Sequence, residues 1–274
     1  MFIASQTNLP TRRCAIILSI IFIRQKAMNE SAAPDTPVLR LEGVSKSYGT
    51  GRILQDIDIR LQRGSFTGLV GVNGAGKTTL IKCLLDFCSL DGGRIEIFGQ
   101  QHNTPQARRQ LAFLPERFTP PYFLSGREFV RAMLEFVHIR FDESTVRTMF
   151  KDLDLEAGAL EKPVRSFSKG MTQKLGLAAC FLSGRDFFLF DEPMSGLDPK
   201  ARARVKALLT MLRAEGKTVL LTSHSLADIE EICDYMLVLH RGHIAFSGAP
   251  LELRERFGAP TLEHAFLRCI EADG

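Results

Sequence analysis

Two stretches near the start of the chain alternate apolar and polar residues, the pattern of a strand with one buried face. Residues 37–49 ("PVLRLEGVSKSYG") predict an edge strand, and residues 52–64 ("RILQDIDIRLQRG") repeat the alternation. We therefore expect two or three antiparallel strands to open the fold. Further short strands are expected at 92–100 ("GGRIEIFGQ") and at 110–116 ("QLAFLPE"), the latter buried and ending at Pro115.

The pattern becomes helical between Gly126 and Phe181, where apolar residues recur at three- and four-residue steps. The apolar run "DFFLFDEP" (186–193) then predicts a strand inside a parallel sheet, and helix and strand patterns alternate after it up to residue 242. Such alternation implies right-handed crossovers and a parallel sheet. A hairpin strand at 243–250 and a helical tail from Leu251 are expected to follow.

Together these elements predict an α/β fold with a mostly parallel sheet, an antiparallel β subdomain at its N-terminal side and an inserted α-helical subdomain. One domain is expected over 28–274 after an extension at 1–27. Its expected parts are a core at 38–116 and 183–250, a helical insert at 117–182 and a helical tail at 251–274.

The charge is uneven along the chain. The formal net charge is +4, and residues 1–28 hold four basic residues and no acidic one, so 31 basic residues balance 31 acidic ones from Asn29 onward. A neutral body gives no support for a nucleic-acid partner. The six cysteines show no C-x-x-C pair and no metal-finger spacing, which favours buried reduced thiols and a reducing compartment.

The apolar run "CAIILSIIFI", Cys14 to Ile23, is ten residues long, short of the roughly 20 that a membrane helix needs. The basic "RQK" after it and the lack of a small-residue cleavage site argue against a signal peptide. The preferred hypothesis is that translation starts at Met28 and that the first 27 residues are non-structural. A membrane-surface anchor and an amphipathic partner segment are the alternatives.

A glycine-rich turn lies between a strand pattern and a helix pattern in "GLVGVNGAGKTTLIKCLL", Gly68 to Leu85. Such a turn groups backbone N–H donors at a helix N-terminus, which suits a phosphate. The spacing of Gly71, Gly76, Lys77 and Thr78 fits G-x-x-x-x-G-K-[ST], so Lys77 would reach the outer phosphates and the Thr78 hydroxyl would bind Mg²⁺. The motif predicts a P-loop NTPase core and leaves its chemistry open.

Asp191 and Glu192 follow four apolar residues. A carboxylate at the C-terminal end of a buried parallel strand lies where such sheets bind ligands. Asp191 would hold Mg²⁺ through water, and Glu192 would polarise a water attacking the terminal phosphate as a general base. The alternative is a solvated acidic pair at a strand end.

The segment "SFSKGMTQKLGLA" (166–178) resembles the signature of the ABC-transporter ATPase family, and the order of the other motifs is similar to the family's. The resemblance implies an adenine-stacking Tyr48, a Walker A loop at 71–79, a Walker B strand at 187–191 and a D-loop, "SGLD", from Ser195 to Asp198. His224 resembles the switch histidine, which would contact the γ-phosphate; the alternative is a histidine that caps the next helix. The implied ATP contacts are Tyr48, Gly71, Asn73, Gly74, Ala75, Gly76, Lys77, Thr78, Thr79, Glu116, Ser168, Gly170 and Asp198; the implied metal ligands are Thr78, Asp191 and Glu116, and the catalytic residues Glu192 and His224.

Ser168 and Gly170 lie at the start of an apolar helix pattern, where a hydroxyl, a small residue and a helix N-terminus form a second phosphate cradle. The family arrangement is a head-to-tail dimer that holds ATP between the P-loop of one subunit and the signature of the other. ATP is then part of the interface, and hydrolysis removes what joins the two halves.

The chain departs from the family pattern at two places. Glu116 stands where the family usually has glutamine, and "FSKGM" stands where it usually has "LSGGQ". A carboxylate at 116 still binds Mg²⁺ but adds negative charge beside Asp191 and Glu192. Lys169 adds a positive charge near the phosphates; since the serine and the second glycine remain, activity is expected to survive.

From residue 29 onward no apolar run could span a bilayer. The resemblance therefore implies a cytoplasmic motor subunit, peripheral on the inner face of the cell membrane, which uses ATP and Mg²⁺ and docks on separate permease subunits. "LPE", "SKGM" and the tail "PTLEHAFLR" resemble the exporter branch, and importers stay open. Phe118, Tyr122 and Phe123 either form the docking surface or pack internally. A soluble ABC ATPase acting on a ribosome or DNA is the competing class, and a P-loop kinase or GTPase is a third.

Overall fold

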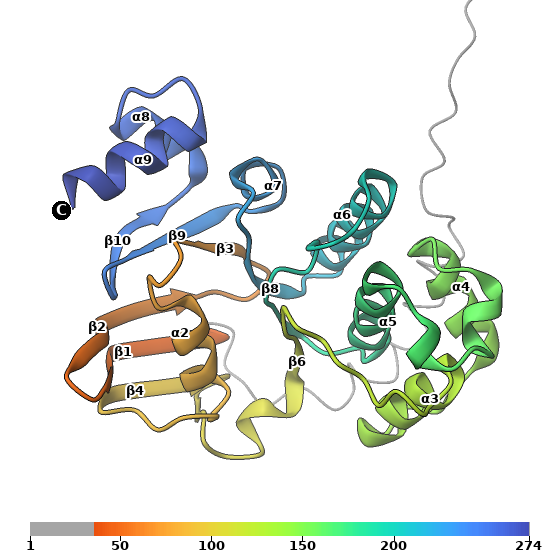
Figure 1. The fold of residues 1–274 in the computed structure, drawn as a ribbon. Helices are drawn as coiled ribbons and strands as arrows, with labels where there is room; N and C mark the ends of the chain where they lie inside the picture. The colour runs from red at the N-terminus through yellow and green to blue at the C-terminus, as the bar shows by residue number, and fades with distance from the viewer. Residues whose placement is uncertain (1–35, 274) are drawn as a thin grey trace, which may run out of the picture. The chain divides into compact units, whose positions relative to one another are not determined.

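The structure is a computed structural model that describes residues 36–273 (Figure 1). The expected extension at 1–27, the translation start at Met28 and Cys14 lie outside the described residues. Two compact units are present. We call them the helical unit, residues 117–184 and 194–212, and the sheet unit, which holds residues 36–116, 185–193 and 213–273.

The sheet unit contains a six-stranded sheet in the order β10-β9-β3-β8-β7-β6. Among its described strand pairs, β10 is antiparallel to β9 and every other pair is parallel. All residues of β3, β7 and β8 are buried, which is why these strands are almost continuously apolar. The bounds are β3 (Phe66–Val70), β6 (Leu111–Leu114), β7 (Phe187–Phe190), β8 (Thr218–Thr222), β9 (Tyr235–His240) and β10 (His243–Gly248).

A second, four-stranded sheet of the same unit is antiparallel, in the order β2-β1-β4-β5. The prediction that residues 37–49 form an edge strand is wrong, because β1 pairs with β2 on one side and with β4 on the other. Alternation records which face of a strand is buried and says nothing of its hydrogen-bonded neighbours. The bounds are β1 (Leu39–Tyr48), β2 (Gly51–Leu61), β4 (Gly92–Ile97) and β5 (Gln100–Gln101).

Among the helices of the sheet unit, α7 and α9 begin at polar caps and α2 begins at the glycine-rich turn. Ser225 caps α7 by accepting from the Asp228 N–H at 3.3 Å, and Thr261 caps α9 in the same way. A hydrogen bond of 2.8 Å between His243 Nε2 and Asp273 Oδ1 joins β10 to the end of α9. The bounds are α2 (Lys77–Leu84), η1 (Ala107–Gln110), α7 (Leu226–Ile232), α8 (Pro250–Arg256) and α9 (Leu262–Ala272).

The helical unit is built around α5, which is buried from Gln173 to Leu182 and is therefore apolar on almost every side. Ser125 and Glu128 form a capping box at the start of α3. None of the described helices has the length and apolar content that a bilayer span requires. The bounds are α3 (Gly126–Phe136), α4 (Glu143–Asp152), η2 (Ala157–Leu160), η3 (Val164–Ser166), α5 (Lys169–Leu182) and α6 (Pro199–Ala214).

The predicted fold class is confirmed: a mostly parallel sheet, an antiparallel β subdomain and inserted helices are all present. Residues 194–212, which the sequence analysis assigned to the core, cluster with the helices instead. Sequence patterning cannot reveal this, because α6 has the amphipathic pattern of any helix that covers a sheet.

Candidate functional site

The glycine-rich turn between β3 and α2 has the backbone that its sequence predicts. Gly74 and Gly76 adopt φ values of 81° and 112°, in the left-handed region that favours glycine. The Ala75 N–H donates to the Val72 carbonyl at 3.1 Å and closes the turn. A Cβ atom on Gly71 would lie 2.3 Å from the Leu239 carbonyl oxygen, so this glycine lets the turn pack against the end of β9.

Lys77, the first residue of α2, points back into this turn. Its Nζ donates to the carbonyls of Gly71 at 2.6 Å and Val72 at 3.2 Å. Burial lowers the pKa of Lys77, and the nearby carboxylates of Glu192, Asp191 and Glu116 oppose that shift. The turn thus holds an ammonium group beside the N-terminus of a helix, where an anion is doubly favoured.

A hollow of about 320 Å³ opens beside the turn, and we call it the P-loop hollow. Every described residue that lines it belongs to the sheet unit. It collects most of the predicted ATP and metal residues; Gly71, Ser168, Gly170 and Asp198 are not among its lining residues. The residues that line the P-loop hollow are Tyr48, Ile53, Asn73, Gly74, Ala75, Gly76, Lys77, Thr78, Thr79, Glu116, Asp191, Glu192, Thr222 and His224.

Thr222, at the end of β8, bonds to both acidic residues that follow β7. Its hydroxyl donates to Asp191 Oδ1 at 2.7 Å and accepts from the Glu192 N–H at 2.9 Å. Thr222 is fully buried. Neither Thr222 nor Ile53 was predicted as a site residue from the sequence, because threonine and isoleucine in strands are ordinary strand formers. The one available signal was the position of Thr222 two residues before His224.

Glu192 occupies an unusual position. Its φ of 51° lies in the left-handed region, which a residue other than glycine adopts at a cost and which clusters at functional sites. Burial raises the pKa of Glu192, and the charges of Asp191 and Glu116 raise it further, whereas His224 and Lys77 act to lower it. His224 Nε2 lies 3.5 Å from Glu192 Oε1. A carboxyl group with a raised pKa in a lined hollow is a candidate proton acceptor.

His224 does not cap the helix after it, since Ser225 does. Its side chain is 58% exposed at the hollow, against 12% for Glu192. The histidine is therefore placed to contact both Glu192 and a molecule in the hollow.

The donor set of the hollow fits Mg²⁺. Thr78 offers a hydroxyl and Asp191 and Glu116 offer carboxylates, the oxygen ligands that this ion prefers. With Glu192 the hollow holds three carboxyl groups against one lysine, and a bound divalent cation would balance this negative charge.

Tyr48 forms one wall of the hollow with half of its side chain exposed. The Lys46 ammonium lies over the Tyr48 ring, 5.5 Å from its centroid, in a cation–π contact. The exposed ring is thus available for stacking on an aromatic base.

The predicted signature and D-loop residues meet within the helical unit. Ser168 caps α5 by accepting from the Met171 N–H at 3.2 Å. A Cβ on Gly170 would lie 3.3 Å from the Gly196 carbonyl oxygen, so the two segments are in close contact. Asp198 accepts from the Ala201 N–H at 2.9 Å, and this bond lowers its pKa.

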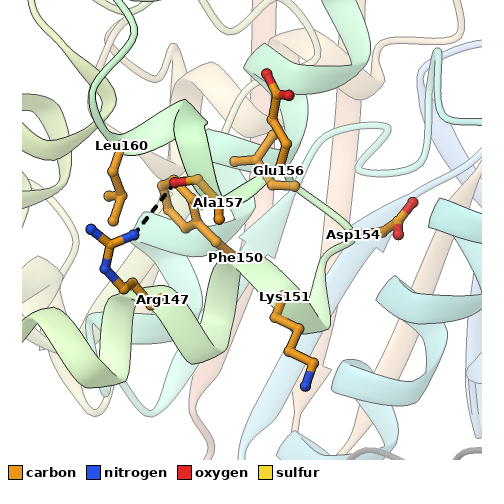
Figure 2. A pocket seen from close by; sticks show the side chains of 8 residues that line it. Arg147, Phe150, Lys151, Asp154, Glu156, Ala157 and Leu160 are labelled. Atoms are coloured by element: carbon orange, nitrogen blue, oxygen red, sulfur yellow. Dashed lines mark hydrogen bonds between the residues drawn. The ribbon is translucent and has the colours of Figure 1, made fainter.

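A second hollow, of about 400 Å³, lies in the helical unit between α4 and η2 (Figure 2). Among the described residues, no predicted site residue lines it. Arg147 donates to the Ala157 carbonyl at 3.5 Å and pairs with Glu143, while Phe150 and Leu160 are buried. Glu143 already neutralises the charge of the Arg147 guanidinium, so this hollow is a weaker candidate binding site than the P-loop hollow.

Two aromatics of the segment after Glu116 are exposed and one is not. Phe118 packs edge-on against the buried Phe129, with ring centroids 5.7 Å apart. Tyr122 and Phe123 are 69% and 70% exposed and pack on each other. Of these three aromatics, only Phe118 therefore packs internally. Tyr122 and Phe123 form a small apolar surface of the helical unit.

The comparisons with known proteins agree with this geometry. The family model described as "ABC transporter" matches residues 54–195, from β2 through the turn, the signature and Asp191. The chain belongs to the ABC transporter family. An uncharacterized ABC transporter ATP-binding protein of Synechocystis sp. is 36% identical to it over 77% of this chain and 62% of its own length. The chain thus spans about six tenths of that relative.

Two further proteins are similar to this ABC transporter family member over more of their length. Nod factor export ATP-binding protein I of Ralstonia nicotianae is 33% identical over 80% of this chain and 69% of its own. The solved structure of an ATP binding subunit of an ABC transporter is 30% identical, with a TM-score of 0.78, and covers 85% of this chain and 99% of that one. These similarities confirm the expected family and exclude the P-loop kinase or GTPase alternative.

Proposed function

We propose that this chain is the ATP-binding and ATP-hydrolysing subunit of an ABC transporter, and that it energises transport, most simply export, through a separate permease. The observation that carries the proposal is the P-loop hollow, which places Lys77, a helix N-terminus, an exposed tyrosine and three carboxyl groups around one space. A nucleoside triphosphate with Mg²⁺ matches this combination of donors, charge and stacking surface.

The residues divide the work of hydrolysis among them. The N–H groups of the turn and Lys77 bind the phosphates, and Tyr48 stacks on the base. Thr78, Asp191 and Glu116 would hold Mg²⁺, which supplies neutralisation of the phosphate charge when bound. Glu192 takes the proton of the attacking water, and its raised pKa makes its carboxylate a stronger proton acceptor than an ordinary glutamate. His224 orients the Glu192 carboxylate from 3.5 Å.

The site is proposed to be completed by a second copy. Ser168 and the N-terminus of α5 form a phosphate cradle, yet the described lining of the P-loop hollow holds no residue of the helical unit. A head-to-tail dimer would place the Ser168 of one copy against the nucleotide of the other. ATP would then join the copies, and its hydrolysis would release them.

A membrane permease is the proposed partner. The exposed pair of Tyr122 and Phe123 in the helical unit suits such a contact, because aromatic side chains are enriched at interfaces. The similar protein of Ralstonia nicotianae is named for export, which favours export over import and over a ribosome- or DNA-acting ATPase. The chain would then lie at the cytoplasmic face of the cell membrane.

Two variants test the proposal by separating binding from hydrolysis. Glu192→Gln removes the base but keeps the shape, so we expect it to bind fluorescent ATP with unchanged affinity and to lose at least about 100-fold in phosphate release. Lys77→Ala removes the phosphate charge contact, so we expect weaker binding itself. A wild-type rate of phosphate release in Glu192→Gln would refute the assignment of the base.

A further inference from the structure

Two cysteines touch each other at the end of α2, the helix that follows the glycine-rich turn. Cys83 lies near the end of α2, and Cys88 follows after the chain has turned back at Asp86, whose φ is 61°. The Phe87 N–H donates to the Lys82 carbonyl at 2.8 Å and fixes this turn. The two Sγ atoms are brought to 3.5 Å, and no disulfide joins the cysteines within the described residues.

The two thiols differ in access. Cys83 is 0% exposed, while Cys88 is partly exposed. Burial raises the pKa of Cys83 to about 12, so its thiol is almost fully protonated at neutral pH. Cys88 is therefore the thiol that an oxidant reaches first, and Cys83 lies in contact to react with the product.

Cys88 also connects the P-loop helix to the proposed base-stacking residue. A hydrogen bond between Tyr48 and Cys88 raises the pKa of the Tyr48 hydroxyl. The Lys46 ammonium lies over the Tyr48 ring and pairs with Asp91 at 2.9 Å. Cys88 thus interacts both with Tyr48 and with Cys83, which is on the same helix as Lys77.

We propose that Cys83 and Cys88 form an oxidisable dithiol, a modification site at which a hydroperoxide makes a reversible disulfide that weakens nucleotide binding. The effect on binding rests on the proposed function, whereas the formation of the disulfide does not.

The chemistry balances with a hydroperoxide as the oxidant. The Cys88 thiolate attacks one oxygen of hydrogen peroxide, the O–O bond breaks, and Cys88 becomes a sulfenic acid. The leaving hydroxide takes up the proton that the Cys88 thiol gave up and departs as water. The Cys83 sulfur then attacks the Cys88 sulfur, the S–O bond breaks, and the leaving hydroxide takes the Cys83 proton as a second water. The two thiols lose two electrons and the peroxide gains them. Because Cys83 must give up its proton, this step should quicken as the pH rises.

Disulfide formation must move at least one of the two sulfur atoms, and Cys88 is the one that interacts with Tyr48. An S–S bond of about 2.05 Å requires the sulfur atoms to approach by about 1.5 Å from their present separation. Tyr48 would lose its hydrogen bond and with it part of its fixed orientation. The loss of one such bond corresponds to nucleotide affinity that is about two- to tenfold weaker.

The test uses the purified full chain, treated with hydrogen peroxide, alkylated and digested with trypsin. Cleavage after Lys82 and Arg94 releases both cysteines on one peptide, 83–94, so the disulfide is detected as a loss of about 2 Da with no alkylation. Dithiothreitol should restore two alkylated cysteines. Cys88→Ser should abolish the product, and Cys269→Ser, which removes a buried cysteine elsewhere in the sheet unit, should not.

Fluorescent ATP binding is measured on the same samples, with thermal unfolding as the check that each variant is folded. We expect peroxide to weaken binding by the wild-type chain and by Cys269→Ser, with no effect on Cys88→Ser or Cys83→Ala. Stable sulfinic acid on Cys88, or an unmodified peptide, would overturn the dithiol. A disulfide without an affinity change would overturn its regulatory effect. A reduced chain that binds no ATP would overturn the proposed function, while the mass measurement would still decide the dithiol.

Discussion

Thr222 offers the sharpest test of how the fold holds its two acidic residues. Thr222→Val keeps the shape of the side chain but removes the hydroxyl that donates to Asp191 at 2.7 Å and accepts from the Glu192 N–H at 2.9 Å. A lost hydrogen bond to a carboxylate and a part-buried N–H left without its acceptor each cost free energy. Together we expect these two losses to lower the free energy of unfolding by about 2–4 kcal/mol.

Thr222→Ser is the matched control. It keeps the hydroxyl and removes one buried methyl group, which costs about 1 kcal/mol. The serine variant should therefore be more stable than the valine variant, although serine is the smaller and less apolar side chain. Hydrophobic burial alone predicts the opposite order.

The same pair should differ in catalysis. The Glu192 backbone has a left-handed φ of 51° and is held through its N–H by Thr222, so valine frees the carboxylate to move. A displacement of about 1 Å costs on the order of 100-fold in rate, while ATP affinity, set by the P-loop, should change little. Urea unfolding and steady-state phosphate release provide the two readouts. Equal stability and equal kcat in the two variants would refute the reasoning.

Two further predictions concern the charges of the hollow. Glu116→Gln should keep the maximal rate but raise the Mg²⁺ concentration for half-maximal activity. The control Glu135→Gln, which changes an exposed glutamate of the helical unit, should leave that Mg²⁺ concentration unchanged. An unchanged Mg²⁺ titration for Glu116→Gln would place residue 116 away from the metal. Because burial raises the pKa of Glu192 above the ordinary 4.5, and the base acts only when deprotonated, kcat should fall with decreasing pH already above that value; an acid limb at or below 4.5 would contradict the raised pKa.

Local sequence rules predicted the P-loop well because its chemistry is local. The backbone at residues 74 and 76 is left-handed, which favours glycine at both positions. Lys77 starts the helix that the motif implies. The buried parallel strands were likewise visible, since β7 is apolar throughout and β8 has three apolar residues between its two threonines.

Features that depend on which strands become neighbours were not visible in the sequence. β1 was expected at a sheet edge and lies between β2 and β4, because alternation carries no information along the hydrogen-bonding direction. Thr222 was missed for the same reason: its role exists only because β8 pairs with β7 and brings it beside Asp191. The grouping of residues 194–212 with the helical unit also arises from tertiary packing.

The central claim is that ATP joins two copies, with the Ser168 of one copy on the nucleotide of the other. The most direct measurement is the molar mass of the chain by size exclusion with light scattering, with and without Mg²⁺-ATP, in the Glu192→Gln background that prevents turnover. Glu192→Gln should be a monomer without nucleotide and a dimer with it. Addition of Ser168→Arg should leave it monomeric with ATP while it binds ATP as Glu192→Gln does, because its P-loop is intact. A Ser168→Arg chain that dimerises as fully as its parent, or a parent that stays monomeric at saturating ATP, would contradict the account.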